Sequence, residues 1–256
     1  MAITPKIAAV SYLNTIPFIY GIEHEGNFSA DLLLLNPAEC AQAFASGQVD
    51  IALVPAAVVP SLPMAEVVSE YCIGASGEVR TVVVVSDDPI DQIKRIFVDT
   101  HSRTSVQLAG YLAKNLWKID PEWFVLEDMA QLAHAEDGDA FLLIGDKVFE
   151  HEAEFEYSYD LAAEWLRSTS LPFAFAVWVA RKGTSYDLLD ALEQALEWGV
   201  EHLYEAILEY RADGSTVESY QYLSENIDFL FDAQKRKALE KFWDCGIKIE
   251  PKSNPG

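Results

Sequence analysis

Short, continuously apolar runs alternate with segments of helical periodicity along the first part of the chain. Three of these runs are predicted to form buried strands, because they are rich in Val, Ile, Leu and Ala: residues 6–10, 32–35 and 50–54. Asn36 and Pro37 supply an N-cap and a proline at the first helical position, and Gly47 supplies a C-cap, so residues 38–46 are predicted to be helical. A turn at residues 14–17 leads into another short helix. This β-α-β-α-β order predicts parallel strands joined by right-handed crossovers.

The remainder of the chain repeats the alternation around two longer apolar strands, at residues 79–86 and 173–180. Two shorter strands and five helices complete the prediction: strands at 96–99 and 141–144, and helices at 104–116, 161–166, 185–211, 216–226 and 232–245. We therefore expect an α/β protein with two lobes, joined by a two-stranded hinge and carrying a C-terminal helical segment. The first lobe is expected to contain residues 1–84 and 181–256, and the second, inserted lobe residues 85–180.

Composition restricts the class of protein further. Of the 256 residues, 50% are apolar, which excludes a disordered or low-complexity chain. With 41 acidic and 18 basic residues the net charge is −23, and this charge disfavours binding to nucleic acids or anionic membranes. Residues 119–166 hold fourteen acidic side chains and one cation, Lys147, and are interpreted as a solvated acidic face. The three cysteines share no close spacing, and no signal peptide or membrane span is evident, so a cytoplasmic location is expected.

Polar side chains follow the first predicted strand directly. In open α/β sheets, ligands bind beyond the carboxyl ends of the strands, and in this chain two such ends could face one cleft that closes at the hinge. Ser11, Asn14 and Thr15 occupy such a position and could present hydroxyl, amide and backbone N–H groups to a ligand. The alternative is that Asn14 or Thr15 only caps the following helix.

A second polar segment follows the strand predicted at residues 96–99. Ser102, Arg103, Thr104 and Ser105 open a helix and offer hydroxyls, helix N–H groups and a guanidinium, which together suit a carboxylate or phosphate. Capping by Ser102 or Thr104 is the alternative. Capping alone does not explain why Arg103, a cation, stands at a helix N-terminus, where cations are disfavoured.

Two further positions lie near the predicted hinge and a strand end. Thr81 lies near the start of the long strand predicted at residues 79–86 and near the hinge, next to Arg80, for which an ion pair is the commoner role. Gly145 ends the strand at residues 141–144, where a glycine allows a ligand to approach the backbone or simply makes a turn. The sequence contains no P-loop, GxGxxG, nucleophile elbow, HExxH or paired-cysteine motif, so nucleotide, metal and acyl-enzyme chemistry have no support.

Six segments resemble the chorismate dehydratase family of the futalosine route to menaquinone. They are VSYLNTIPF (10–18), NPAECAQAFASGQVDIALVP (36–55), DTHSRTSVQL (99–108), LLIGD (142–146), EWLRSTSLPFAFAVWVAR (164–181) and YLSENIDFLFDAQKRKALEKFW (222–243). The resemblance implies a periplasmic-binding-protein-like fold of the second type, which agrees with the two lobes expected above. It also implies a lyase that removes water from chorismate, a dianion, to give 3-[(1-carboxyvinyl)oxy]benzoate without a cofactor.

The resemblance assigns roles to the polar segments. It implies that Asn14 acts at the reacting carbon while Ser11 and Thr15 help to hold the substrate. An amide is a poor base, so Asn14 could instead only orient the substrate while the substrate's own side-chain carboxylate takes the proton. Thr81, which stands where the family is expected to have a serine, is implied to contact one substrate carboxylate. Gly145 is expected to line the site.

The segment that opens the helix after residue 99 is implied to hold the other substrate carboxylate. Its four members act together as a clamp: Ser102, Arg103, Thr104 and Ser105. Three rival functions stay open: the 1,4-dihydroxy-6-naphthoate synthase of the same pathway, a non-catalytic small-anion-binding protein, and the ligand-sensing domain of a transcription regulator. The last two fit poorly, since no export signal is evident and the acidic chain has no room for a DNA-binding unit.

Overall fold

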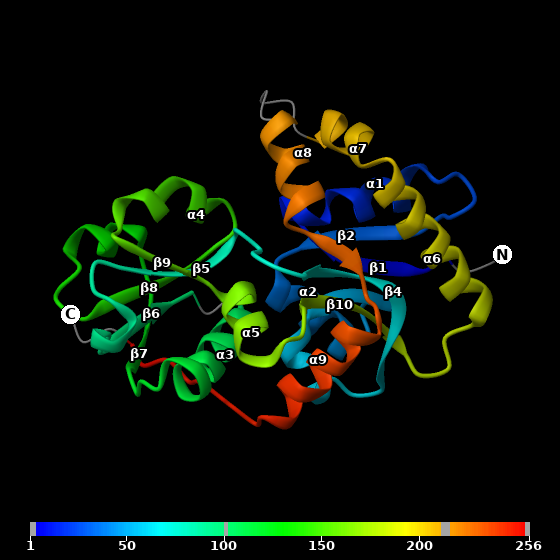
Figure 1. Ribbon diagram of the computed structural model, residues 1–256. Coiled ribbons are helices and arrows are strands. Elements are labelled where there is room, and N and C mark those ends of the chain that lie inside the picture. Colours follow the sequence, from blue (N-terminus) through cyan, green and yellow to red (C-terminus); the bar gives the residue numbers. More distant parts are fainter. Residues whose placement is uncertain (1–3, 100–101, 211–215, 254–256) are drawn as a thin grey trace. The chain divides into compact units, whose positions relative to one another are not determined.

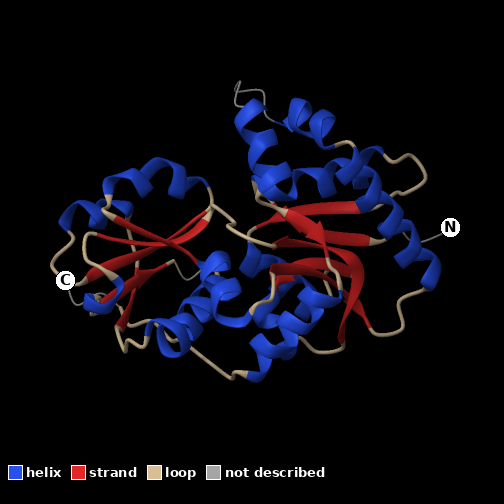
Figure 2. Ribbon diagram, in the orientation of Figure 1, coloured by secondary structure: helices blue, strands red, loops and turns tan. Residues whose placement is uncertain are grey.

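The computed structural model describes residues 4–99, 102–210 and 216–253 (Figure 1). Contacts divide the chain into two units, Met1–Ala75 with Ala174–Arg236, and Ser76–Phe173 with Lys237–Gly256. Each unit is built around its own sheet (Figure 2). The α/β architecture with two lobes, predicted from the sequence, is therefore confirmed.

The first sheet has six strands in the order β11-β4-β10-β3-β1-β2. Their bounds are β1 Lys6–Val10, β2 Asp31–Leu35, β3 Ile51–Pro55, β4 Ala65–Ala75, β10 Phe173–Arg181 and β11 Asp228–Leu230. β1 pairs in parallel with both β2 and β3, as the βαβ pattern predicts, and β10 runs antiparallel to β3. The alternation of strand and helix in the first 55 residues thus produced the parallel core of this sheet.

Six α-helices of the described residues belong wholly or in part to the first unit. They are α1 Ile16–His24, α2 Pro37–Ser46, α6 Tyr186–Glu201, α7 Leu203–Tyr210, α8 Thr216–Glu225 and α9 Ala233–Asp244. The caps predicted for α2 are confirmed: the Asn36 side chain accepts from the Glu39 N–H at 2.9 Å, Glu39 returns a bond to the Asn36 N–H, and Gly47 ends the helix with φ 79°. Figure 1 shows α1 and α6 on one side of the sheet and α2 on the other.

Two glycines allow α1 and α6 to pack backbone against backbone. A Cβ atom on Gly21 would lie 1.9 Å from the carbonyl oxygen of Ala195, and one on Gly199 would lie 1.9 Å from the carbonyl oxygen of Pro17. Any side chain at either position would therefore force the helices apart. This close contact holds α6 over the same face of the sheet as α1.

Two sequence predictions for the first unit are wrong. The single helix predicted over residues 185–211 breaks at His202, whose φ of −104° and ψ of 35° lie outside the helical range. The His202 ring stacks on Trp198 with centroids 3.9 Å apart, and its Nδ1 lies 2.7 Å from the Trp198 carbonyl oxygen. The longest strand, β4, was not predicted at all, because polar residues and glycine interrupt its apolar pattern.

The second sheet has five strands in the order β7-β6-β8-β5-β9. Their bounds are β5 Val82–Ser86, β6 Arg95–Val98, β7 Glu122–Val125, β8 Asp139–Ile144 and β9 Tyr157–Asp160. β6 pairs in parallel with β7 and β8, whereas β5 runs antiparallel to β8 and β9. Three α-helices accompany it: α3 Arg103–Leu112, α4 Asp146–His151 and α5 Leu161–Thr169. In its core Phe97 stacks on both Phe124 and Phe141.

The chain crosses between the two units at positions that differ from the predicted boundaries. The chain passes from one unit to the other after Ala75, Phe173 and Arg236, whereas the sequence places the crossings after residues 84 and 180. The residues after Arg236 join the second unit, in which Phe242 packs edge-on against Trp165 and Phe173. A strand buried on both faces has the same composition in either sheet, so its sequence does not say which sheet it joins.

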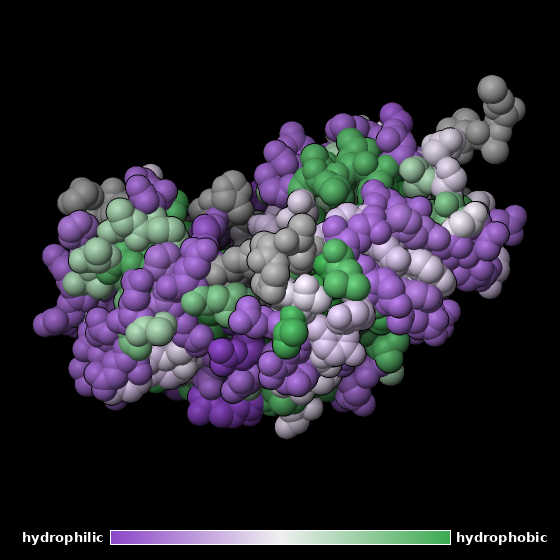
Figure 3. All heavy atoms as spheres, turned by 90° about the horizontal axis from the view of Figure 1, so that it is seen from above, coloured by the Kyte–Doolittle hydropathy of each residue, from purple (hydrophilic) through white to green (hydrophobic). Residues whose placement is uncertain are grey.

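One face of the molecule is mostly polar (Figure 3). Figure 3 shows this face, on which hydrophilic residues predominate and hydrophobic residues gather in separate patches. The large apolar side chains with more than half of their surface exposed are Met64, Phe149, Tyr186, Tyr204, Leu208, Val217 and Leu230. Among the described residues, no helix combines the length and the apolar character required to cross a bilayer.

Candidate functional site

The first candidate edge lies at the carboxyl ends of the parallel strands in the six-stranded sheet. β1 lies between β2 and β3, so the chain moves to one side of β1 for β2 and then back across it for β3. The strand order therefore reverses at β1, and in open α/β sheets ligands bind where such a reversal occurs. Ser11 follows β1 directly and belongs to this edge.

Three predicted residues lie at this edge. Ser11 is exposed, and its backbone N–H donates to the Leu35 carbonyl oxygen at 3.2 Å. Asn14 is half-buried, and the hydroxyl of the buried Thr15 donates to its Oδ1 at 3.4 Å. Thr15 is the N-cap residue of α1, yet its side chain makes no capping bond. The capping interpretation is therefore wrong for Thr15, whose hydroxyl instead orients the amide of Asn14.

The second candidate edge repeats this arrangement in the five-stranded sheet. β6 lies between β7 and β8, both of which run parallel to it, so the strand order reverses at β6. The segments that follow β6 and β8 lie next to each other, since the Lys147 ammonium is 3.0 Å from Asp99 Oδ2. Both units thus carry polar segments at the kind of edge where α/β proteins bind small molecules.

The start of α3 carries four of the predicted residues at this second edge. Ser102 is its N-cap residue but makes no side-chain capping bond, and its Oγ lies 2.8 Å from Ser105 Oγ. Thr104 and Ser105 are buried, whereas Arg103 is exposed and forms no ion pair with any described residue. Ser102 therefore gives the first backbone N–H groups of α3 no side-chain cap, and Arg103 is the first residue of the helix, which is a combination that suits an anion.

Thr100 and His101, which belong to the quoted motif, lie outside the described residues. The capping interpretation for Ser102 is wrong, because its hydroxyl pairs with Ser105 rather than with a backbone N–H.

Thr81 and Gly145 are neighbours at the same edge. The Gly145 N–H donates to the Thr81 carbonyl oxygen at 2.8 Å, directly beyond the antiparallel pair Val82 and Ile144. Thr81 is buried, and its hydroxyl donates to the Val79 carbonyl oxygen at 3.4 Å. Gly145 has φ 69° and ψ −144°, a conformation open almost only to glycine, and no atom would meet a Cβ there within 4 Å.

The predicted strand over residues 79–86 begins only at Val82, because Arg80 adopts a left-handed φ of 66°. The Arg80 N–H donates to Asp160 Oδ2 at 2.7 Å, and Asp160 Oδ1 accepts from the first N–H groups of α5. Burial raises the pKa of Asp160, against the effect of these backbone hydrogen bonds. The ion pair expected for Arg80 is confirmed, with its guanidinium 3.7 Å from Glu152.

The structure thus gathers the predicted residues into two groups, one in each unit. Ser11, Asn14 and Thr15 form the first group, and Thr81, residues 102–105 and Gly145 form the second. Lys147 and Asp99 are not among the site residues predicted from the sequence. One signal was available, since Lys147 is the single cation in residues 119–166.

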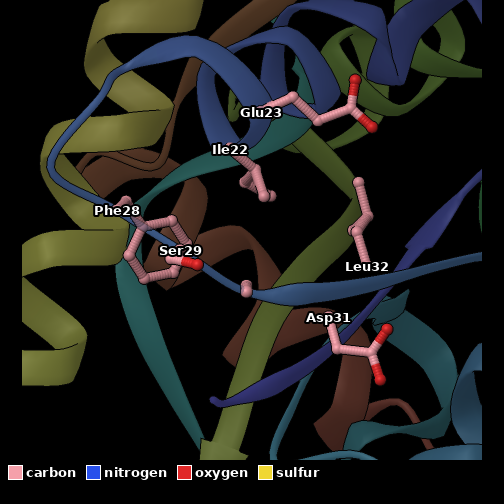
Figure 4. A pocket seen from close by; sticks show the side chains of 7 residues that line it. Ile22, Glu23, Phe28, Ser29, Asp31 and Leu32 are labelled. Atoms are coloured by element: carbon pink, nitrogen blue, oxygen red, sulfur yellow. The ribbon is translucent and has the colours of Figure 1, made fainter.

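An open cavity of about 330 Å³ lies elsewhere, at the amino end of β2 (Figure 4). Its lining residues are Ile22, Glu23, Phe28, Ser29, Ala30, Asp31 and Leu32. Asp31 begins β2, so the cavity lies at the opposite end of that strand from the edge that holds Ser11. None of the predicted site residues lines it, and the carboxyl edges remain the better candidates on chemical grounds.

A model of a protein family described as acting in menaquinone biosynthesis matches residues 5–248. The chain belongs to the menaquinone biosynthesis family. The resemblance stated from the sequence motifs is thereby confirmed at the level of the family. A chorismate dehydratase from Thermus thermophilus is 27% identical in an alignment 267 residues long. The alignment covers 95% of this chain and 96% of that protein.

Solved structures show how widely the fold of this menaquinone-family chain is shared. Protein AF1704 from Archaeoglobus fulgidus aligns with a TM-score of 0.73 at 15% identity, covering 94% of this chain and 96% of that one. The periplasmic aliphatic sulphonate binding protein SsuA from Escherichia coli aligns with a TM-score of 0.60 at 12% identity, covering 96% and 92%. A Candida albicans protein described as having the generic periplasmic binding protein fold aligns at 0.64, with 15% identity and coverage of 98% and 92%. The predicted periplasmic-binding-protein-like fold is therefore confirmed.

Proposed function

We propose that this member of the menaquinone biosynthesis family is a chorismate dehydratase, a lyase that converts chorismate to 3-[(1-carboxyvinyl)oxy]benzoate and water. The family match covers nearly the whole chain, and the Thermus thermophilus relative bears that name at 27% identity. The observation that carries the proposal is the start of α3, where the Ser102 side chain makes no capping bond and the exposed Arg103 is the first helical residue. The chain as a whole has a net charge of −23 and repels anions. The start of α3 is therefore a local exception, because its groups attract an anion.

The proposed reaction is a redox-neutral elimination. The hydrogen on ring carbon C3 leaves as a proton, its electron pair forms the C3–C4 double bond, and the hydroxyl on C4 departs, so that proton and hydroxide make water. The ring carboxylate, conjugated through the diene, acidifies the C3 hydrogen. Because the product ring is aromatic, the step is strongly downhill, and the protein needs mainly to orient the substrate and stabilise developing negative charge. No oxidant, reductant or cofactor is required for the balance.

Asn14 is assigned to the reacting carbon. Its Oδ1 accepts from the Thr15 hydroxyl, which fixes the amide, and its Nδ2 has no partner among the described residues. An amide is too weak a base to take the C3 proton, so Asn14 orients the substrate and the substrate's side-chain carboxylate accepts the proton. Ser11, exposed at the end of β1, contributes a hydroxyl to the same substrate.

The carboxylates are assigned to the edge of the five-stranded sheet. Arg103 and the backbone N–H groups of α3 hold one carboxylate, with the hydroxyls of Ser102, Thr104 and Ser105 around it. The neighbours Thr81 and Gly145, joined by a backbone hydrogen bond of 2.8 Å, are assigned to the other carboxylate. This division gives each carboxylate of a dianionic substrate a place of its own.

The test is incubation of the purified protein with chorismate, followed by mass spectrometry and ultraviolet spectroscopy. The proposal predicts a product lighter by one water with a benzoate spectrum, formed in proportion to enzyme concentration. Arg103→Ala serves as the control that separates catalysis from spontaneous decay of chorismate. Saturable binding of chorismate without turnover would favour a non-catalytic binding protein, and complete indifference to chorismate would favour the naphthoate synthase of the same pathway. The predicted cytoplasmic location and lack of nucleic-acid or membrane partners remain predictions.

A further inference from the structure

Lys147 and Asp99 form an ion pair at the carboxyl edge of the five-stranded sheet. Asp99 directly follows β6, and Lys147 is the second residue of α4, which follows β8. The Lys147 Nζ lies 3.0 Å from Asp99 Oδ2, and the two side chains are 45% and 23% exposed. The pair therefore joins the segment that follows β6 to the segment that follows β8.

The position of Asp99 poses an electrostatic problem for an anion site. Its carboxylate belongs to the segment that leads from β6 into α3, where the Ser102 N–H donates to the Asp99 carbonyl oxygen at 3.3 Å. A negative charge so close to the start of α3 would repel an anion bound to the N–H groups and Arg103. Partial burial of Asp99 limits the screening of this repulsion by water and salt.

Lys147 places a positive charge 3.0 Å from Asp99 Oδ2 and so offsets the charge of that carboxylate. The stretch from residue 119 to residue 166 contains fourteen acidic residues and this single cation, so the composition of the stretch gives no reason to expect a lysine at that place. An ordinary surface pair would contribute little to stability. This pair matters because the carboxylate that it neutralises, that of Asp99, belongs to the segment that leads into α3.

We propose that Lys147 is a positioning residue, which neutralises Asp99 and so lets the start of α3 accept a carboxylate of the substrate. This inference rests on the proposed function for the identity of the substrate. Lys147 acts through Asp99 and need not touch the substrate. The residue should therefore affect how tightly the anion binds far more than how fast the bound substrate reacts.

A set of four variants tests the assignment: Lys147→Met, Lys147→Arg, Asp99→Asn, and Asp99→Asn with Lys147→Met. We expect Lys147→Met to raise the KM for chorismate about tenfold or more, with kcat within about threefold of wild type. Lys147→Arg, which keeps the charge, should restore KM to within about threefold. The double variant should also restore it, since no carboxylate then remains to be neutralised. Thermal melting of each variant shows whether it is folded.

Two results would overturn the assignment. One is an unchanged KM in folded Lys147→Met. The other is a double variant as impaired as Lys147→Met, which would mean that Lys147 acts directly on the ligand or only on the fold. Calorimetric titration with benzene-1,3-dicarboxylate separates this inference from the proposed function. If the wild type ignores chorismate but binds this dianion, the same four-variant comparison still decides the role of Lys147; if it binds neither, both proposals fail.

Discussion

The backbone N–H of Gly145 donates a hydrogen bond of 2.8 Å to the carbonyl oxygen of Thr81. This bond continues the antiparallel ladder of β5 and β8 by one step beyond the pair Val82 and Ile144. It places the start of β5 beside the end of β8, so that residues distant in the sequence share one edge. The edge also holds Asp99 and Lys147, and the position of Thr81 gives the first prediction.

Removal of the Thr81 hydroxyl should impair catalysis more than folding. Thr81→Val keeps the shape but loses the group assigned to a substrate carboxylate, so we expect kcat/KM to fall roughly tenfold to a hundredfold. The lost bond to the Val79 carbonyl is long, at 3.4 Å, and its loss should cost at most about 1 kcal/mol of stability. Thr81→Ser is the matched control and should keep kcat/KM within about threefold. Equal activity of the valine and serine variants would remove Thr81 from the site.

Asn14 should be needed for turnover and nearly dispensable for stability. Its side chain is bonded only to the Thr15 hydroxyl among the described residues, and it caps no helix. Asn14→Ala should therefore leave the melting temperature nearly unchanged while kcat falls at least about a hundredfold, as expected when an oriented polar group is lost. Steady-state kinetics on chorismate, with circular dichroism melts, check both parts. Wild-type turnover in a folded Asn14→Ala would exclude Asn14 from the mechanism.

Arg103 is expected to act on the ligand and not on the fold. It is exposed and forms no ion pair within the described part of the chain, so Arg103→Ala should not lower the free energy of unfolding measurably. Loss of the charged contact should cost about 2–4 kcal/mol of transition-state binding, which appears in kcat/KM. Arg103→Lys keeps the positive charge but loses the bidentate geometry of the guanidinium. Its kcat/KM should therefore lie between those of the wild type and Arg103→Ala. A loss of kcat/KM below tenfold for Arg103→Ala would contradict the proposed clamp.

Asp160 should make stability depend on pH in a defined direction. Burial raises its native pKa above the usual value near 3.8, so the folded protein binds this proton more tightly than the unfolded chain does. The resulting stabilisation is fully present below the unfolded pKa and is lost as the pH rises through the native pKa. Urea unfolding of wild type and Asp160→Asn between pH 3.5 and 7, values chosen to span roughly the titration range of an acid, should show wild type losing stability relative to the variant as pH rises. A constant difference across the series would contradict this assignment.

The contact of α1 with α6 should not tolerate a methyl group. A Cβ atom on Gly199 would lie 1.9 Å from the Pro17 carbonyl oxygen and 2.9 Å from the Gly21 nitrogen. Gly199→Ala should therefore destabilise the protein by about 2 kcal/mol or more, despite the better helix propensity of alanine. Gly77→Ala is the control, since no atom would meet its Cβ within 4 Å. Chemical denaturation measures both, and equal stabilities would show that the helices separate without cost.

Local signals determined much of the fold from the sequence alone. The boundaries of α2 followed from Asn36, Pro37 and Gly47, because a cap needs only atoms within a few residues of the helix end. The parallel pairing of β1 with its neighbours followed from the alternation of strand and helix. The candidate site residues could also be predicted from local signals. The carboxyl end of a strand can be located along the sequence before the partners of that strand are known.

The tertiary structure alone decided which distant segments meet. The place of β4 depends on its neighbours in the sheet, β10 and β11, which the apolar pattern of the sequence did not reveal. The pairing of Lys147 with Asp99 likewise exists only because β6 and β8 are adjacent. Sequence patterns report the burial and conformation of each residue within its own turn or strand. Ion pairs, strand neighbours and close helix contacts depend on the three-dimensional packing of segments far apart in the chain.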